Sequence, residues 1–169
     1  VIGPEIGEMA CGEFGEGKLT EPSAILSYLN NYFLNISKNK KLKALVTTGP
    51  TQENIDPVRY ITNHSSGLQG YEIAKSLSEN GFETTLISGP TNLKDLPNIN
   101  IIKIKTAKEM FDKIIKNLPV DVAIFAAAVS DFTFVGQLKE KIKKKEGLQL
   151  NLTKTKDILS YVSKHNSLR

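Results

Sequence analysis

Several features that mark particular protein classes are missing from this sequence of 169 residues. A single cysteine excludes a disulfide bond within the chain, and it fits a reducing compartment. No apolar run approaches the roughly 20 residues that a membrane-spanning helix needs. The first residues carry acidic groups and lack the basic region of a signal peptide. We therefore expect a cytoplasmic globular domain that does not bind membranes.

Signatures of common cofactor sites are missing as well. The first predicted strand is not followed by the G-x-G-x-x-G pattern of dinucleotide-binding domains, and the sequence has no P-loop. No cluster of cysteine and histidine has the spacing of metal ligands. The net charge of +4 is mild, and it suits a phosphate-bearing small ligand as well as a nucleic acid. Composition thus leaves the function to be decided by motifs.

Strand and helix patterns alternate through the middle of the chain. Short apolar strands are predicted at residues 42–47, 84–88, 99–104 and 122–129, and the last is a continuous run typical of a strand buried on both faces. Helices are predicted at residues 70–77 and after Thr106, which forms a capping box with Glu109. This alternation predicts an α/β fold with a doubly wound, Rossmann-like parallel sheet. We expect it to be truncated at the C-terminus, because no terminating pattern precedes Arg169.

The patterns at the two ends of the chain are weaker. Residues 1–22 are rich in glycine and are predicted to form a loop. A helix is expected after Pro22, with one apolar face formed by Ile25, Leu26, Leu29 and Phe33. Residues 35–43 are polar and basic and are interpreted as a linker. Near the other end, residues 148–152 alternate as in a short strand, and Thr155 is a candidate cap for a last helix.

A long polar segment, residues 49–67, separates the first strand of the sheet from the following helix. Loops of this length in a compact domain are usually functional, and open α/β sheets bind ligands beside the carboxyl ends of their strands. Apolar residues are spaced through it, so we expect an ordered and partly buried loop; they are Ile55, Val58, Tyr60 and Ile61. Arg59 is expected to pair with Asp56 or Glu53 as a structural clamp.

The polar segment ends in Asn63-His64-Ser65-Ser66-Gly67, directly before a helix. The hydroxyl groups of Ser65 and Ser66, together with the free N–H groups and positive dipole of a helix start, can bind a phosphate. The alternative is plain N-capping by Asn63 or Ser65, which the spacing alone favours.

A second group of candidates follows the apolar run that ends at Val129. Asp131 stands at the carboxyl edge of that predicted strand, where a carboxylate can hold Mg²⁺ or a sugar hydroxyl, or can cap a turn. Farther along, Lys141, Lys143 and Lys144 could neutralise a polyphosphate. The alternative for these lysines is a solvated run of charges.

Taken together, the motifs resemble those of phosphopantothenate–cysteine ligase, also called phosphopantothenoylcysteine synthetase. The stretch GPTQENIDPVRYITNHSSG resembles its first signature, AAAVSDF followed by KIKK its second, and TKDIL its third, in the expected order. MACGEFGEGKLTEP resembles the C-terminal flap of phosphopantothenoylcysteine decarboxylase, to which the ligase is fused in many bacteria. We therefore predict that residues 1–38 are a decarboxylase remnant and residues 39–169 an incomplete ligase domain.

The resemblance implies a reaction of coenzyme A biosynthesis. The carboxylate of 4′-phosphopantothenate would attack the α-phosphate of CTP, assisted by Mg²⁺, and give an acyl-cytidylate and pyrophosphate. The amine of L-cysteine would then attack the acyl carbon and release CMP. A homodimer formed through the ligase domain is implied too. FMN would serve the decarboxylase half of the parent and is not expected on this chain.

The resemblance also implies roles for individual residues. Asn63 would bind the acyl-cytidylate, and Lys141 would contact phosphate and promote the reaction. Asp131 would serve the nucleotide or the metal. Cys11 matches the flap cysteine that donates a proton in the decarboxylase. Phosphate would be bound by Ser65, Ser66 and Gly67, and the cytidine by backbone groups of Ala126, Ala127 and Ala128 and by Lys156, Asp157, Ile158 and Leu159.

The sequence departs from the family pattern at a few positions. Pro50 replaces the usual second glycine of the first signature, Leu68 replaces a lysine, and Thr155-Lys156 replaces Asn-Pro in the third. Two other functions fit the predicted fold. An oxidoreductase that binds NAD(P) is disfavoured by the missing glycine fingerprint. A nucleic-acid-binding domain is disfavoured because the lysines cluster in one segment with few aromatic residues beside them, so we expect no nucleic acid partner.

Overall fold

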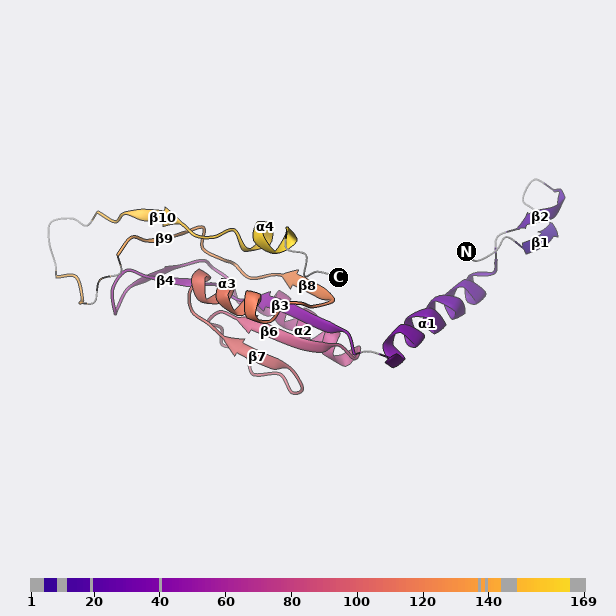
Figure 1. Ribbon diagram of the computed structural model, residues 1–169, viewed down its shortest axis with the longest axis horizontal. Helices are drawn as coiled ribbons and strands as arrows, with labels where there is room; N and C mark the ends of the chain where they lie inside the picture. Colours follow the sequence, from indigo (N-terminus) through magenta and orange to yellow (C-terminus); the bar gives the residue numbers. More distant parts are fainter. Residues whose placement is uncertain are drawn as a thin grey trace. The chain divides into compact units, whose positions relative to one another are not determined.

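The computed structural model describes residues 5–8, 12–18, 20–39, 41–136, 138, 140–143 and 149–164, with the backbone alone for residues 17–18 and 33–39. It divides into two compact units, Val1–Lys41 and Leu42–Arg169 (Figure 1). Cys11, Lys144 and Leu148, which carried predictions from the sequence, lie outside the described residues. Within the described residues, no helix is long and apolar enough to cross a membrane.

The first unit consists of a β-hairpin and a helix. Strand β1 (Glu5–Glu8) pairs antiparallel with β2 (Phe14–Lys18), and helix α1 spans Pro22–Asn39. The predicted loop is therefore wrong for these two strands, because antiparallel pairing places Gly7 opposite Gly15 and accommodates both glycines. The predicted linker is also wrong up to Asn39, since its polar residues continue the helix.

The second unit is built on a parallel four-stranded sheet with the order β7-β6-β3-β8. The strands are β3 (Lys43–Thr48), β6 (Glu83–Ser88), β7 (Asn100–Lys103) and β8 (Val122–Phe125). Strands β3, β6 and β7 are added in one direction, and β8 is added on the other side of β3. The direction of winding thus reverses between β3 and β8, which is where sheets of this kind bind their ligands.

Alternate residues of the strands serve two hydrophobic cores, one on each face of the sheet. Val46 and Leu86 pack with helix α2 (Leu68–Glu79). Leu45 and Ile87 pack with α3 (Ala107–Lys116) and α4 (Ile158–Ser163). Successive side chains of a strand point to opposite faces, so this division follows from the two-residue period of a strand. The predicted doubly wound α/β fold is confirmed.

Strand β8 is shorter and more exposed than its sequence predicts. It ends at Phe125 rather than at Val129, and all of its residues are half-buried instead of fully buried. The physical reason is its position, because β8 is an edge of the described sheet with β3 as its only described neighbour. The rest of the apolar run leaves the sheet, and Ala127 and Val129 pack against the core that contains α3.

Two small antiparallel pairs extend from the sheet on the side of its carboxyl ends. Strand β4 (Gln52–Asn54) pairs with β5 (Tyr60–Thr62), and β9 (Phe132–Phe134) pairs with β10 (Leu152–Lys154). In Figure 1, β9 and β10 run side by side, with β4 nearby. The polar segment is thus ordered as predicted, but Val58, Tyr60 and Ile61 are exposed because a two-stranded hairpin has no second layer to cover them. The predicted last strand begins only at Leu152.

Candidate active site

A cavity of about 650 Å³ opens at the carboxyl ends of β3 and β8. Thr47 contributes from the end of β3, and Ala127, Val129 and Asp131 contribute from the segment after β8. The lining is continued by Lys154, Thr155, Lys156, Asp157, Ile158 and Leu159. The cavity therefore joins two stretches that lie far apart in the chain, and its volume is in the range of small-molecule sites.

The N–H groups of the three alanines after β8 are engaged within the protein. Ala126 donates to the carbonyl of Thr47 at 3.2 Å, and Ala128 donates to the carbonyl of Gly49 at 2.9 Å. Ala127 donates to the hydroxyl of Thr47 at 3.4 Å. The carbonyl oxygens of Ala126 and Ala127 accept no hydrogen bond from the described residues. Their carbonyl groups are therefore the backbone groups left for a ligand, and only Ala127 of the three is among the described residues that line the cavity.

Asn63 connects the polar segment to the rim of this cavity. Its side-chain Nδ2 donates to the carbonyl oxygens of Ala128 at 3.2 Å and Val129 at 3.1 Å. Both acceptors are carbonyl groups, so the amide is oriented with Oδ1 as the group that remains available. Asn63 thus fixes the first predicted signature against the second.

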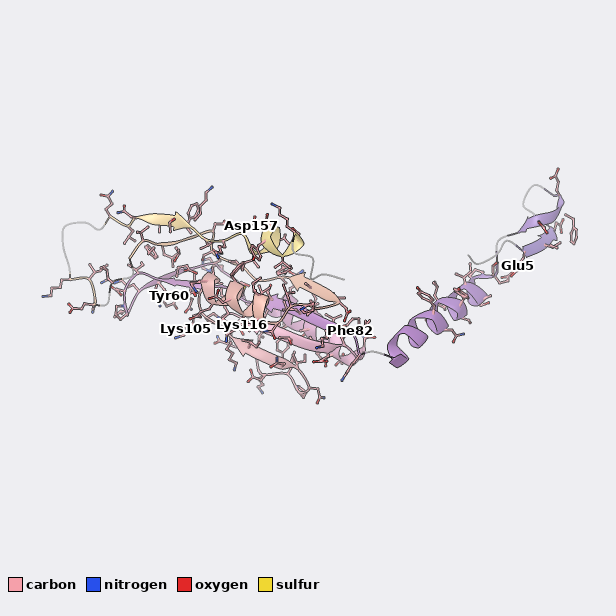
Figure 2. The ribbon with its side chains drawn as sticks, viewed as in Figure 1. Glu5, Tyr60, Phe82, Lys105, Lys116 and Asp157 are labelled. Carbon is pink, nitrogen blue, oxygen red and sulfur yellow. The ribbon has the colours of Figure 1, made fainter. Side chains whose placement is uncertain are left out.

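Residues 154–159 are fixed against the segment after β8 by Thr155. Its hydroxyl donates to the carbonyl of Ser130 at 2.7 Å, and its N–H donates to the carbonyl of Asp131 at 2.9 Å. Thr155 therefore does not cap the last helix as predicted. Asp157, labelled at the start of α4 in Figure 2, caps it by accepting from the N–H of Ser160 at 2.8 Å.

The charged groups of the cavity differ in how far they are constrained. The Nζ of Lys156 lies 4.5 Å from the centroid of the Phe111 ring, a cation–π distance. The carboxylate of Asp157 is held by the helix cap. Asp131 is exposed at the cavity wall. Among the described residues, no group of three or more His, Cys, Asp or Glu is placed to hold a metal ion.

Ser65 and Ser66, which precede the start of α2, help to line a second cavity of about 340 Å³. Gly67 occupies the cap position with φ 76°, and as a glycine it has no side chain to cap the helix. Ser65 Oγ accepts from the N–H of Gly67 at 3.2 Å, and Ser66 Oγ accepts from the N–H of Leu68 at 3.3 Å. Plain capping by Asn63 or Ser65 is therefore wrong.

Two acidic residues of the polar segment are buried and have separate partners. Glu53 accepts from the N–H of Ala107 at 2.8 Å and from the hydroxyl of Thr133 at 2.6 Å. Asp56 forms an ion pair with Arg59 at 3.0 Å. Of the two pairings expected for Arg59, the one with Asp56 is confirmed.

The sequence profile described as DNA/pantothenate metabolism flavoprotein C-terminal domain matches residues 39–169. The chain belongs to this family. It is 40% identical over 167 residues to the coenzyme A biosynthesis bifunctional protein CoaBC of Haemophilus influenzae, and 36% identical over 168 residues to that of Escherichia coli. Each alignment covers 96% of this chain and 41% of the relative. The chain thus spans about two fifths of the length of these relatives.

Solved structures of family members have the same fold. The C-terminal domain of CoaBC matches with a TM-score of 0.63 and 34% identity, over 75% of this chain and 61% of that one. The DNA/pantothenate metabolism flavoprotein from Streptococcus pneumoniae matches with a TM-score of 0.66 and 32% identity, over 75% and 66%. A Cab2 variant in complex with phosphopantothenate-cysteine shares only the fold, at 18% identity and a TM-score of 0.60 over 88% and 69%. The family resemblance predicted from the motifs is confirmed.

Within this family fold, the structure gathers most of the predicted site residues but not all of them. Ala127, Asp131 and residues 156–159 line the larger cavity, and Ser65 and Ser66 line the smaller one. Lys141 is exposed and is not among the described residues that line either cavity. The sequence reasoning missed Thr155 and Glu53 as organising residues. Its position as the first residue of the third signature could have indicated Thr155, whereas no sequence signal marks Glu53 as buried.

Proposed function

We propose that this chain carries the ligase chemistry of coenzyme A biosynthesis, joining 4′-phosphopantothenate to L-cysteine after activation by CTP. One observation carries the proposal. The cavity at the reversal between β3 and β8 is built from the second and third predicted signatures, and Asn63 of the first is hydrogen-bonded to its rim. The relatives from Haemophilus influenzae and Escherichia coli, which are named coenzyme A biosynthesis bifunctional proteins, support the same assignment.

In this proposal the cavity takes the nucleoside of CTP. The carbonyl groups of Ala126 and Ala127 are acceptors, and they suit the exocyclic amino group of cytosine. Uracil carries an oxygen at that position, which would place one acceptor against another. Lys154 and Lys156 line the wall and supply positive charge for the phosphates.

Mg²⁺ fits this site as a companion of the nucleotide. Magnesium in nucleotide enzymes is usually bound by one or two carboxylates together with substrate phosphates. Asp131 provides one exposed carboxylate at the cavity wall. When bound, Mg²⁺ would neutralise the charge of the phosphates, and Asp131 would be the carboxylate that holds it.

We assign the reacting groups to the rim between the two cavities. The uncapped start of α2, with Ser65 and Ser66, would bind a phosphate group. The free Oδ1 of Asn63 would accept a hydrogen bond from the incoming amine or the pantothenate moiety, while its amide nitrogen keeps the rim in place. Lys141 would supply a mobile positive charge to the transferred phosphate.

The test separates nucleotide binding from the two chemical steps. Calorimetry with CTP, UTP, ATP, GTP and NADPH, each with Mg²⁺ where it is a triphosphate, should show the tightest binding for CTP. Pyrophosphate release on adding 4′-phosphopantothenate reports activation, and amide formation after adding L-cysteine reports the second step. Equal affinity for the four triphosphates would contradict base recognition, and preferential binding of NADPH would favour the oxidoreductase instead.

Two variants assign the steps. Asn63→Asp keeps the shape but sets a negative charge against two carbonyl groups and the phosphate, so activation should persist while amide formation slows by about a hundredfold. Lys141→Gln should slow activation by a comparable factor, about a hundredfold, with unchanged thermal stability because its side chain is exposed. Wild-type rates in both variants would indicate that the two residues are only structural.

We further propose a homodimer formed through the ligase domain. Several large apolar side chains are exposed on the two antiparallel pairs beside the sheet; they include Tyr60, Ile61, Phe132 and Leu152. Contiguous exposed apolar surface is typical of protein interfaces. Sedimentation equilibrium should give twice the mass of the chain, and Phe132→Ser with Leu152→Ser should shift it toward the monomer. A monomer at every concentration would refute this part.

The decarboxylase role of Cys11 is proposed for the parent enzyme with FMN. We expect no release of carbon dioxide from phosphopantothenoylcysteine by this chain, even when FMN is added. The reason is that we expect the flavin-binding residues in the part of the relatives that this chain does not cover. Carbon dioxide release by the purified chain, lost in Cys11→Ser, would contradict this expectation.

A further inference from the structure

The turn between β4 and β5 forms hydrogen bonds with the backbone of one distant residue, Ile142. The N–H of Ile142 donates to Asp56 Oδ2 at 3.1 Å. The carbonyl of Ile142 accepts from the Arg59 guanidinium at 2.7 Å. The same guanidinium nitrogen is 3.0 Å from Asp56 Oδ2. Both polar groups of one peptide residue are therefore held by one ion pair, in the way that a neighbouring strand would hold them.

These contacts to Ile142 depend on the carboxylate of Asp56, which is buried and has hydrogen-bond partners at both oxygens. The side chain of Asp56 has no exposed surface, and that of Arg59 is 40% exposed. Asp56 Oδ1 accepts from the N–H groups of Val58 and Arg59, both at 2.8 Å, which fixes the turn itself. Oδ2 is thus free to serve Ile142 and the Arg59 guanidinium, so the two oxygens have separate tasks.

The charge state of Asp56 follows from these contacts. Burial by itself raises the pKa of Asp56. The hydrogen bonds from the N–H groups of Val58, Ile142 and Arg59, together with the charge of Arg59, outweigh burial and hold the pKa below its usual value. Asp56 is therefore charged at neutral pH, and it accepts from the Ile142 N–H at its full strength.

Ile142 lies between two exposed lysines, Lys141 and Lys143. A second contact holds the same part of the chain, because the N–H of Leu138 donates to the carbonyl of Ile55 at 3.3 Å. The hairpin that provides these contacts ends at Thr62, the last residue of β5, and Asn63 at the cavity rim follows directly. The β4–β5 hairpin therefore contacts residues 138–142, and the chain that leaves it contacts the rim of the site.

We propose that Asp56 and Arg59 are positioning residues, which hold the backbone at Ile142 so that Lys141 is presented to the phosphates of the nucleotide. This inference rests on the proposed function. A lysine has a long and mobile side chain, and an unanchored segment would add backbone freedom to it, so that ordering both would weaken the contact with phosphate. Gripping the adjacent peptide leaves only the side chain to be ordered.

The test combines a local measurement with a double-mutant cycle. Asp56→Asn keeps the shape but turns one acceptor into a donor that faces donors. Arg59→Gln keeps the hydrogen bonds of Asp56 to Val58 and to the Arg59 backbone, so it carries the test if Asp56→Asn does not fold. Asp95→Asn is the matched control, because it removes an exposed ion pair with Lys103 of similar length, 2.9 Å.

The first readout is amide hydrogen exchange of Ile142 at neutral pH in the ligand-free chain. The second is the affinity for CTP with Mg²⁺, with and without Lys141→Gln. We expect exchange at Ile142 to accelerate about tenfold or more in both clamp variants, and CTP affinity to fall about tenfold, the size of one lost charge-assisted hydrogen bond. In the Asp56→Asn background, Lys141→Gln should lower the affinity by less than about twofold, because the lysine is already misplaced. Asp95→Asn should change neither quantity.

The outcomes separate this inference from the proposed function. Unchanged amide exchange at Ile142 in both Asp56→Asn and Arg59→Gln would show that these two side chains do not hold the backbone there. Equal effects of Lys141→Gln in the wild-type and Asp56→Asn backgrounds would leave Asp56 structural and overturn positioning. A wild-type chain that binds no CTP would overturn the proposed function itself, and with it the role given to Lys141, whatever the exchange rates are.

Discussion

The starts of helices α2 and α3 show how one fold can use the same feature in two ways. Thr106 and Glu109 close a complete capping box at α3, and the buried carboxylate of Glu53 accepts from the N–H of Ala107. At α2, Gly67 in the left-handed conformation occupies the cap position and offers no side chain, and Ser66 Oγ accepts only from the first helical N–H, that of Leu68. Both helices cover the sheet that ends at the candidate site.

The difference shows which helix start is available to a ligand. The first N–H groups of a helix lack partners within it, and they must be satisfied by side chains, water or a bound group. At α3 side chains satisfy two of them, the N–H groups of Ala107 and Glu109, so this end contributes to stability. At α2 the serines reach only the N–H groups of Gly67 and Leu68, so the following N–H groups remain for an anion at the smaller cavity.

The largest expected loss of stability tests the start of α3, where Glu53 accepts from the N–H of Ala107. Glu53→Ala would leave the N–H of Ala107 and the hydroxyl of Thr133 without their buried acceptor. We expect the free energy of unfolding to fall by about 4 kcal/mol, because each buried polar group left unpaired costs about 1–3 kcal/mol. Urea denaturation measures it. The exposed Glu79→Ala is the control, and an equal loss in both variants would show that Glu53 does not hold α3 in place.

The next largest loss of stability tests the start of α2, at Gly67. A Cβ at Gly67 would lie 2.7 Å from the Thr91 methyl group and 3.2 Å from the backbone of Gly49. Gly67→Ala should therefore lose about 3 kcal/mol, from the left-handed backbone and from overpacking together. Gly81→Ala shares a positive φ but meets no described atom within 4 Å, so it should lose only about 1 kcal/mol.

Thermal unfolding of these two glycine variants separates backbone strain from crowding. Similar losses would mean that the close approach of α2 to the loops after β3 and β6 is not tight. The same Gly67→Ala protein should also bind CTP more weakly, whereas Gly81→Ala should not.

A smaller effect is expected for the capping box. Thr106→Ala removes the hydroxyl that accepts from the N–H of Glu109 at 3.1 Å, and it should lower the free energy of unfolding by about 1 kcal/mol. CTP affinity should be unchanged, since we assign this end no ligand. Loss of affinity in a folded Thr106→Ala protein would remove the contrast between the two helix starts.

The smallest effect is a spectroscopic one. On titration with inorganic pyrophosphate, the backbone amide signals of Gln69 and Gly70 should shift, and those of Ala107 and Glu109 should not. The reason is that α2 begins just after Ser65 and Ser66, which line the smaller cavity, and its dipole favours an anion there, whereas Glu53 and the capping box occupy the start of α3. Shifts of equal size at both helix starts would indicate nonspecific attraction to a basic protein.

The sequence by itself determined the parts of this protein that depend on neighbours along the chain. The alternation of strands and helices predicted the parallel sheet, and Thr106 and Glu109 predicted a cap that spans three residues. The three motifs identified the family, because their residue types occur in a fixed order. Hydrophobic periodicity and capping act over one or two turns, so a linear pattern records them.

Tertiary structure decided what depends on contacts between distant residues. Strands β4 and β5 have three residues each, too few to produce a recognisable period, and they are fixed by pairing with each other. Asn63 reaches a carbonyl 65 residues away, and Asp56 holds an N–H 86 residues away. Strand β8 reads as fully buried because its residues are apolar, but its edge position leaves it half-buried. Burial and partners of a polar side chain are properties of the folded surroundings, which no local pattern encodes.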